Sequence, residues 1–382
     1  MRRDLFSEDH RQFGELVRRF LGSLVVPYFG EWERAGIVPR ELYREAGKLE
    51  IVGVQVPEQY GGGGMGDTFR FNTAMLEEMG RLQTTLTGLV LHMNVVMPYF
   101  LHYATTDQKA RWLPGMAMGE LMTAIAMTEP GTGSDLAGIR TRAARRGSDY
   151  VLSGAKTFIT GGHNAGLVVV VARTAESDVR HGGLSLLVVE EAMRGFSRGR
   201  NLEKLGVKAA DTAELFFDEV RVPRDNLLGD EGAAFGYLTS NLAQERLNIA
   251  IQSVASARAA IMASCDYVSN RRAFGQKISE FQNTKFTLAE CSTELEVAQL
   301  VVDRGVDDLD AGLLSLADAA RIKLFCTEMQ GRVIDKCLQL YGGYGYMLEY
   351  PIAKQYADAR VTRIYGGTSE VMKSIIAKSM GL

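Results

Sequence analysis

The feature that most constrains this chain is a single block of strand-like sequence between two helical regions. The segments "YVLSGAKTFITGG", "LVVVVARTA", "GLSLLVVE" and "TAELFFDEVRVP" lie between residues 150 and 223 and are rich in Val, Leu, Ile, Phe and Thr. Gly, Asn and Pro bound them, as expected for strands joined by turns. No helical pattern between them is long enough for a parallel crossover. We therefore predict an antiparallel barrel or sandwich over residues 125–228.

The flanking sequence has helical periodicity. Phe13, Leu16, Val17 and Phe20 recur at helix spacing behind a possible cap at Ser7. After Gly232, long helical segments over 232–272, 280–309, 313–341 and 350–380 predict a four-helix bundle. The predicted fold class is α+β, with an N-terminal helical domain (1–124), a middle antiparallel β-domain (125–228) and a C-terminal four-helix bundle (229–382).

Composition and charge exclude several classes of function. The formal net charge of −3 gives no reason to expect nucleic acid or an anionic membrane as a partner. No apolar run approaches the ~20 residues of a membrane span, and the polar start does not resemble a secretory signal. The four cysteines form no CxxC, and the five histidines have no metal-ligand spacing. We expect a cytoplasmic protein with buried thiols and no metal.

Glycine-rich stretches occur at 61–66, 131–138 and 342–346, and none has the strand–turn–helix context of a dinucleotide fingerprint. The loop "AMTEPGTGSDLAG" (126–138) is more specific, because its hydroxyls and accessible N–H groups lie at the junction of helical and strand sequence, where a cleft is expected. A polar linker is the alternative. In "NRRAFGQ" (270–276), Arg271 can pair with phosphate and Phe274 can stack on a planar ring. Taken alone, that stretch reads better as a helix C-terminus neutralised by its arginines.

The turn "RIYGGTSEVM" (363–372) allows close approach to its backbone at Gly366 and Gly367 but offers no side chain at its tip that accepts a proton. A carboxylate occurs elsewhere in an unexpected place. On a helix, Leu238, Glu245 and Ile249 share one apolar stripe. Burial there would raise the pKa of Glu245 toward the range of a general base. The alternative, a Glu that reaches the edge of the bundle to meet an arginine, stays equally open.

Three motifs in one order resemble those of the acyl-CoA dehydrogenases: "MTEPGTGSD", "QLYGGYGYMLEYPIAKQYADAR" (339–360) and "IYGGTSE". The resemblance covers nearly the full chain and is greatest to the long-chain branch, with some features shared with isovaleryl-CoA dehydrogenases. It implies the predicted order of domains and, usually, a homotetramer, a dimer of dimers, with one FAD per subunit near a dimer interface. Most members have Glu as base where this chain has Gly366. In the long-chain and isovaleryl branches the base is at the position matching Glu245.

The resemblance also implies roles for individual residues. Glu245 takes the α-proton. The backbone N–H of Gly366 and a ribityl hydroxyl of FAD donate hydrogen bonds to the enolate oxygen. Phe158, Ile159 and Thr160 match a Trp-Ile-Thr segment against the flavin ring, and Thr368 and Glu370 match contacts on the adenosine side. Positions that hold the FAD of a neighbouring subunit match Arg271, Phe274, Gln282, Gln339, Gly342 and Gly343. The remaining expected cofactor contacts are Ile125, Met127, Thr128, Gly133 and Ser134, and the expected substrate contacts are Ser134, Ala243, Gln244, Arg246 and Gly367.

The expected reaction is FAD-dependent α,β-dehydrogenation of a medium-chain, long-chain or branched acyl-CoA to trans-2-enoyl-CoA, with electrons passed to electron-transferring flavoprotein. An acyl-CoA oxidase and a dehydrogenase of acyl-carrier-protein thioesters are the nearest alternatives. A non-catalytic subunit that binds acyl-CoA or FAD is an alternative of another class, because Gly366 replaces the usual base. Glu245 and the flavin motifs argue against that alternative.

Overall fold

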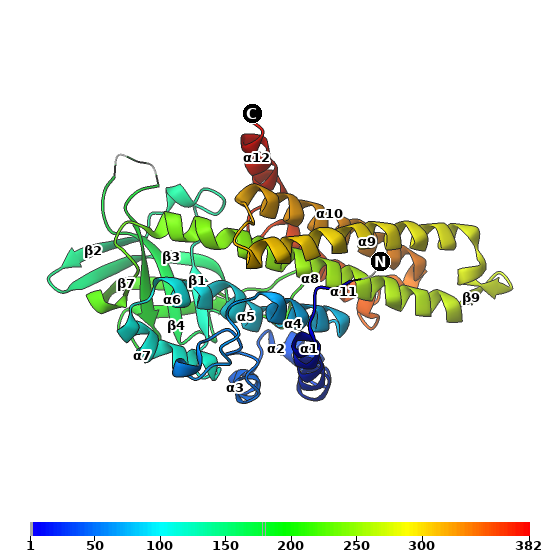
Figure 1. Ribbon diagram of the computed structural model, residues 1–382, viewed down its shortest axis with the longest axis horizontal. Helices are drawn as coiled ribbons and strands as arrows, with labels where there is room; N and C mark the ends of the chain where they lie inside the picture. Colours follow the sequence, from blue (N-terminus) through cyan, green and yellow to red (C-terminus); the bar gives the residue numbers. More distant parts are fainter. Residues whose placement is uncertain (1–2, 178, 180) are drawn as a thin grey trace.

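The structure is a computed structural model that describes residues 3–177, 179 and 181–382. The β-domain lies at one end of an elongated molecule, and the long helices extend away from it (Figure 1). The N-terminal helices lie along one side and bridge the two parts. The predicted α+β organisation, with helices, then a sheet, then helices, is confirmed.

Short helices form the N-terminal region, and the first of them begins where the sequence predicts. Ser7 precedes α1, and its backbone N–H donates to Nδ1 of His10 at 3.1 Å, which satisfies a group that the helix itself leaves unpaired. The segment between α5 and α6 has π-helical geometry, which is rare and frequent at functional sites. The helices are α1 (Glu8–Phe20), α2 (Phe29–Ala35), α3 (Arg40–Lys48), α4 (Arg70–Arg81), α5 (Thr87–Val90), the π-helix η3 (Leu91–Val96), α6 (Met97–Tyr103) and α7 (Thr106–Ala117).

The middle sheet has the order β6-β7-β3-β2-β4-β5-β8, with β1 paired to β4. Most neighbours are antiparallel as predicted, but β1 pairs with β4 in parallel, and β2 meets β4 in parallel at Arg142 and Arg173. The connecting segment contains no α-helix, only the short 3-10 helix η4 (Leu136–Gly138). The loop over 127–141 returns the chain to the starting edge of the sheet, so β2 runs in the same direction as β1. The strands are β1 (Thr123–Ala126), β2 (Arg142–Arg146), β3 (Asp149–Thr160), β4 (Leu167–Arg173), β5 (Leu184–Glu190), β6 (Phe196–Asn201), β7 (Thr212–Pro223) and β8 (Leu227–Leu228).

The C-terminal region is helical, as predicted, and its first three helices are long. They are α8 (Ala234–Asn270), α9 (Gln282–Asp310) and α10 (Leu316–Leu340). The predicted fourth helix over 350–380 is split into α11 (Pro351–Ala359) and α12 (Ser369–Ser379). The break falls at Gly366 and Gly367, whose φ angles of +63° and +98° lie in the left-handed region that a helix cannot contain. A short hairpin, β9 (Arg272–Ala273) and β10 (Gln276–Lys277), joins α8 to α9.

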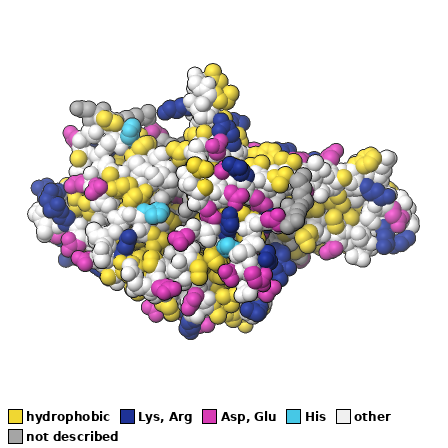
Figure 2. Space-filling model, viewed as in Figure 1, with side chains coloured by type: hydrophobic (Ala, Val, Ile, Leu, Met, Phe, Trp, Pro, Cys, Tyr) yellow, Lys and Arg dark blue, Asp and Glu magenta, His cyan; other side chains and the backbone are white. Residues whose placement is uncertain are grey.

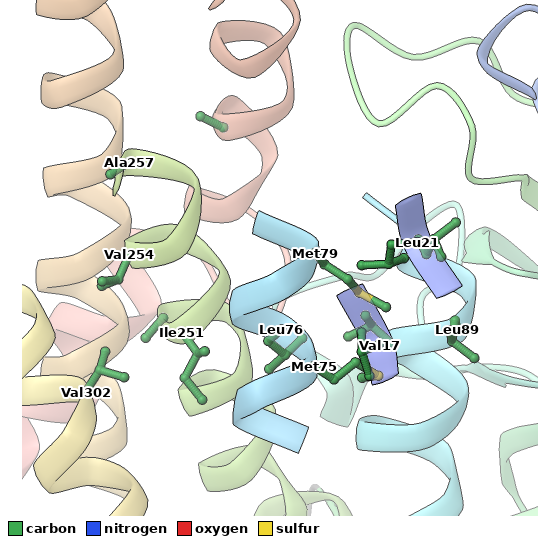
Figure 3. Close-up of a cluster of buried hydrophobic side chains, with 14 of the residues drawn as sticks. Val17, Leu21, Met75, Leu76, Met79, Leu89, Ile251, Val254, Ala257 and Val302 are labelled. Atoms are coloured by element: carbon green, nitrogen blue, oxygen red, sulfur yellow. The ribbon is translucent and has the colours of Figure 1, made fainter. Parts of the chain in front are cut away.

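One hydrophobic core joins the N-terminal helices to the bundle. Leu76 and Met79 on α4 lie beside α8, which carries Ile251 and Val254 (Figure 3). A Cβ added at Gly80 would lie 2.4 Å from the Cβ of Ala255, so a glycine is needed for α4 to approach α8 this closely. This contact fixes α8 against the N-terminal helices and therefore fixes the side chains that α8 presents to them.

Two further properties bear on function. No helix in the described part of the chain is long and apolar enough to cross a membrane. Within residues 3–177, 179 and 181–382, no group of three or more His, Cys, Asp or Glu side chains is arranged to hold a metal ion.

Candidate active site

Glu245 lies inside the protein, near the start of α8, with a side chain that is 7% exposed. The hydroxyl of Tyr99 on α6 donates to its Oε1 at 3.2 Å. Burial raises the pKa of Glu245 to about 7, although the Tyr99 hydrogen bond and the positive charge of Arg246 act in the opposite direction. A carboxylate with this pKa exchanges a proton readily near neutral pH, as a general base must.

The wall opposite Glu245 is the π-helix η3 with α6. The amide of Gln244 donates to the carbonyl of Asn94 at 2.9 Å, and Asn94 donates in turn to Oδ1 of Asn248 at 2.7 Å. Ala243 is buried beside them. These amide hydrogen bonds join η3 to α8, and leaving the buried Asn94 or Asn248 unpaired would cost the full desolvation of a polar group. The spacing between Tyr99 and Glu245 is fixed as a result.

The Gly366 turn packs on α8 one helical turn beyond the carboxylate. A Cβ added at Gly366 would lie 2.5 Å from Cδ1 of Ile249, so the turn lies directly on the α8 stripe. Nε of Arg246 donates to the Gly366 carbonyl at 3.5 Å. The fold therefore brings together Glu245, Arg246 and Gly366, which are about 120 residues apart in sequence.

A buried lysine that sequence reasoning missed also holds this turn. Lys323 on α10 is 0% exposed, and its Nζ donates to the Gly367 carbonyl at 2.6 Å. Burial, followed by the nearby charge of Arg246, lowers the pKa of Lys323 to about 8. With Arg246 and Lys323 bound to successive carbonyls, the turn has a fixed orientation. In sequence Lys323 looks like an ordinary charged helix residue, because Thr327 and Gln330 on the same face of α10 are also polar.

The loop after β1 is held by a second buried pair that the sequence did not indicate. Nζ of Lys156 on β3 donates to Oε1 of Glu129 at 3.0 Å and to the carbonyl of Met127 at 2.9 Å. Burial alone would raise the pKa of Glu129, but hydrogen bonds from Thr141 and Arg140 and the charge of Lys156 lower it. The N–H of Thr157 donates to the Thr128 carbonyl at 3.0 Å. Met127 and Thr128 are therefore fixed beside β3, while Gly133 and Ser134 are exposed farther along the loop.

Phe158 presents an exposed ring next to this loop. It is 68% exposed and has a φ of +59°, at the irregularity in β3 between Lys156 and Ile159. A large apolar residue with positive φ is an unusual and costly arrangement that occurs most often at functional sites. Thr160 is half-buried. The side chains of Ile125 and Ile159 lie in hydrophobic cores.

Another predicted group of residues lies at the opposite end of the bundle. The guanidinium of Arg271 lies 5.2 Å from the ring centre of Tyr344, and Phe274 is 94% exposed. The 26 residues of α8 between Glu245 and Arg271 span about 39 Å. Lys and Arg side chains gather on the surface at this end of the molecule, at the right in Figure 2. Exposed residues at this end also include Gln282, Gln339, Gly342 and Gly343. One chain therefore does not bring this group to Phe158.

The predicted adenosine contacts lie at the start of α12, directly after the Gly366 turn. The Thr368 side chain accepts from the N–H of Val371 at 3.3 Å, which caps the helix. Glu370 is exposed in the first turn, where its carboxylate interacts favourably with the helix dipole.

Comparisons with known proteins identify the family. Three family models match in order: the acyl-CoA dehydrogenase N-terminal domain at residues 7–120, the middle domain at 124–220 and the C-terminal domain at 232–381. The chain belongs to the acyl-CoA dehydrogenase family. It is 45% identical to the mitochondrial long-chain specific acyl-CoA dehydrogenase of Rattus norvegicus, over 99% of this chain and 88% of that protein.

Solved structures of acyl-CoA dehydrogenases have the same fold. The crystal structure of acyl-CoA dehydrogenase from Geobacillus kaustophilus matches with a TM-score of 0.96 and 44% identity, over 99% of both chains. A chain from a structure of the electron transferring flavoprotein of Acidaminococcus fermentans matches with a TM-score of 0.94 and 31% identity, over 100% of this chain and 99% of that one. The predicted family, fold and enzyme class are confirmed, and the family reaction is the dehydrogenation of an acyl-CoA.

Acyl-CoA dehydrogenases are flavoproteins, and the residues present fit a flavin. An exposed ring at a strained backbone position, with a fixed loop beside it, offers the flat apolar surface and nearby hydroxyls that an isoalloxazine ring requires. The basic and aromatic residues around Arg271 offer phosphate and ring contacts, and they lie about 39 Å along α8 from Glu245.

Proposed function

We propose that Glu245 is the catalytic base that removes the α-proton of an acyl-CoA thioester, giving a trans-2-enoyl-CoA. The observation that carries this proposal is the buried Glu245 carboxylate on the same stripe of α8 that contacts the Gly366 turn. Because its pKa is raised to about 7, the carboxylate can take up a proton near neutral pH. The hydroxyl of Tyr99 orients Oε1, so the proton is accepted by a carboxylate that is already positioned.

The Gly366 turn is proposed to supply its backbone N–H to the thioester oxygen, where negative charge develops as the α-proton leaves. Arg246 and Lys323 bind the carbonyls of Gly366 and Gly367, so these carbonyls point toward the cations and away from the substrate oxygen. A preoriented donor costs no reorganisation during the reaction. Gly366 therefore contributes through its backbone, and the absence of a side chain lets the turn pack directly against Ile249.

FAD is the proposed cofactor, and when bound it supplies the acceptor for the hydride from the β-carbon. Phe158, Thr128 and Thr160 are proposed to hold the ring end of the cofactor. The residues around Arg271 and Gln339 are proposed to contact the cofactor of a neighbouring subunit, which explains their separation from Phe158 within one chain. This arrangement requires at least a dimer, and we propose a homotetramer built as a dimer of dimers.

The proposed substrates are medium-chain, long-chain or branched acyl-CoAs, with electron-transferring flavoprotein as electron acceptor. The name of the rat relative supports a long chain, and the likeness to a chain from the Acidaminococcus fermentans structure supports this acceptor. An acyl-CoA oxidase and a dehydrogenase of carrier-protein thioesters are the rival assignments.

Anaerobic flavin bleaching tests the proposal directly. The purified yellow protein is mixed without oxygen with acyl-CoAs that differ in length and branching, and flavin absorbance is followed. Rapid bleaching by at least one acyl-CoA is expected, and no bleaching by any of them contradicts the proposal. Turnover is then compared with air and with electron-transferring flavoprotein. Peroxide formation at the flavoprotein-dependent rate indicates an oxidase, and bleaching only by carrier-protein thioesters indicates the other rival.

A further inference from the structure

A buried base must lose the proton that it has taken, and little of Glu245 reaches solvent. Its side chain is 7% exposed, and Oε1 accepts a hydrogen bond from the hydroxyl of Tyr99 at 3.2 Å. Once the carboxylate has removed a proton from a substrate, it can act again only after that proton has reached water. The hydroxyl that is already bonded to the carboxylate is the first group that can take part in this transfer.

Tyr99 on α6 cannot carry the proton away as an ionised group. It is fully buried, and burial, followed by the charge of Glu245, raises the pKa of its hydroxyl well above the ordinary value. The hydroxyl therefore stays neutral, and it transmits a proton only by accepting one while it donates its own. Such a transfer requires a second polar group beyond Tyr99.

Asn241 on α8 provides this polar group. It precedes Glu245 by four residues, which is about one helical turn and about 6 Å along the axis. Its side chain is 8% exposed and lies within hydrogen-bonding reach of the Tyr99 hydroxyl. Its Nδ2 has no hydrogen-bond partner among the residues that the structure describes. A buried amide with an unused donor, beside a buried hydroxyl, has the polar partners that a bound water molecule requires.

His102 extends this line of groups to the surface. It follows Tyr99 by three residues, its side chain is exposed, and its ring lies within hydrogen-bonding reach of Asn241. Partial burial, followed by the positive charge of Lys109, lowers the pKa of His102, so the ring is neutral at neutral pH and can accept a proton. Polar groups from α6 and α8 therefore connect Glu245 to solvent.

This line leaves Glu245 on the side away from the Gly366 turn. The turn packs on Ile249, four residues after Glu245, whereas Asn241 lies four residues before it. A thioester held at the Gly366 turn would therefore not block the line.

We propose that Tyr99 and Asn241 form a proton exit from Glu245. The protonated carboxyl group donates its proton to the Tyr99 oxygen, and Tyr99 donates its own proton to a water molecule held by the Asn241 amide. That water passes a proton to His102 or to bulk solvent. Each transfer moves one proton and no electrons, so Glu245 becomes a carboxylate again and Tyr99 is unchanged. This inference rests on the proposed role of Glu245 as the base.

The test follows the fate of the α-hydrogen. An acyl-CoA that bleaches the flavin, such as hexadecanoyl-CoA, is prepared with deuterium at both α-positions and incubated in ordinary water without oxygen or another electron acceptor. Under these conditions the reaction reverses, and Glu245 returns a proton to the α-carbon. If the deuteron has already left Glu245, the ester gains ordinary hydrogen, which mass spectrometry of the recovered ester measures. The rate of this deuterium loss is divided by the rate of flavin bleaching with the same ester.

The wild-type protein should lose α-deuterium at a rate comparable with that of flavin bleaching. Tyr99→Phe and Asn241→Leu should lower the ratio of deuterium loss to bleaching by about tenfold or more, because a deuteron that cannot leave Glu245 returns to the same carbon. Asn241→Ser keeps a side chain that binds water and should recover part of the ratio. Tyr28→Phe removes the hydroxyl of an exposed tyrosine, so it is the matched control and should leave the ratio unchanged.

A purely structural role would slow bleaching and deuterium loss together and leave their ratio at the wild-type value. That result in either Tyr99→Phe or Asn241→Leu would overturn the inference, and so would a wild-type protein that bleaches but retains its α-deuterium. Asn241→Leu removes an amide whose donor is unpaired, so it keeps the test decisive if Tyr99→Phe does not fold. Failure of every acyl-CoA to bleach the flavin would instead contradict the proposed function.

Discussion

Replacing Glu245 with Gln should abolish catalysis and at the same time stabilise the protein. Gln has nearly the same shape and still offers an oxygen to the Tyr99 hydroxyl, but it accepts no proton. Flavin reduction by acyl-CoA should therefore fall by at least ~10²-fold, the lower end of what a positioned base contributes. Binding of FAD and acyl-CoA should be retained.

The stability gain follows from the pKa of Glu245, which burial raises from 4.5 to about 7. Between these values the folded protein binds this proton more tightly than the unfolded chain, so the free energy of unfolding falls as pH rises. Above pH 7 the folded protein carries the full free-energy cost of burying the ionised Glu245 carboxylate. This rise in the pKa of Glu245 corresponds to about 3 kcal/mol. At an unfolding entropy of about 2.1 cal/mol/K per residue, this is about 4 °C in Tm for a chain of this length that unfolds as one unit.

The assay combines thermal unfolding of the holoenzyme between pH 5 and 8.5 with stopped-flow flavin reduction. Glu245→Gln should gain little at the acidic end and about 4 °C at pH 8. Glu15→Gln, on the exposed face of α1, is the matched control and should show no pH-dependent gain. In the parent protein, flavin reduction should rise with pH through about 7 as Glu245 loses its proton. Flavin reduction by Glu245→Gln at the parent rate, or a Tm gain that does not vary with pH, would refute the reasoning.

Three further predictions concern residues that fix the site. Lys323→Met should lower the rate of flavin reduction about tenfold or more, and weaken acyl-CoA binding less, because the Gly367 carbonyl loses a charged donor. Lys323→Arg should recover part of this rate. An unchanged rate in Lys323→Met would exclude a positioning role for Lys323. Lys156→Met should destabilise the protein by about 3–5 kcal/mol, because it leaves Glu129 buried without its cation, and a melting temperature equal to that of the parent would contradict this account. Arg271→Ala should lose FAD and weaken the oligomer together, as measured by flavin content and light scattering on dilution; full FAD occupancy under dilution would count against a shared cofactor site.

Much of the fold is readable from local pattern. The periodicities of 3.6 and 2 residues separate the helical regions from the sheet, because each pattern buries an apolar surface in only one kind of element. The start of α1 after Ser7 has the same local origin. The unusual position of Glu245 is also visible locally, as a carboxylate on an apolar stripe. These features depend on residues within a few turns of one another.

Tertiary structure decided the rest, because those features depend on residues far apart in the chain. The stripe alone left open whether Glu245 meets an arginine at the edge of the bundle, and packing against Tyr99 and η3 decided that it is buried. The parallel pairing of β1 with β4 depends on the path of the loop over 127–141, which has no periodic pattern. Lys323 and Lys156 look like ordinary charged residues in sequence, and only the fold shows that their ammonium groups are buried on backbone carbonyls. Periodicity reports which face of an element is covered, whereas the identity of the covering group depends on contacts between distant segments.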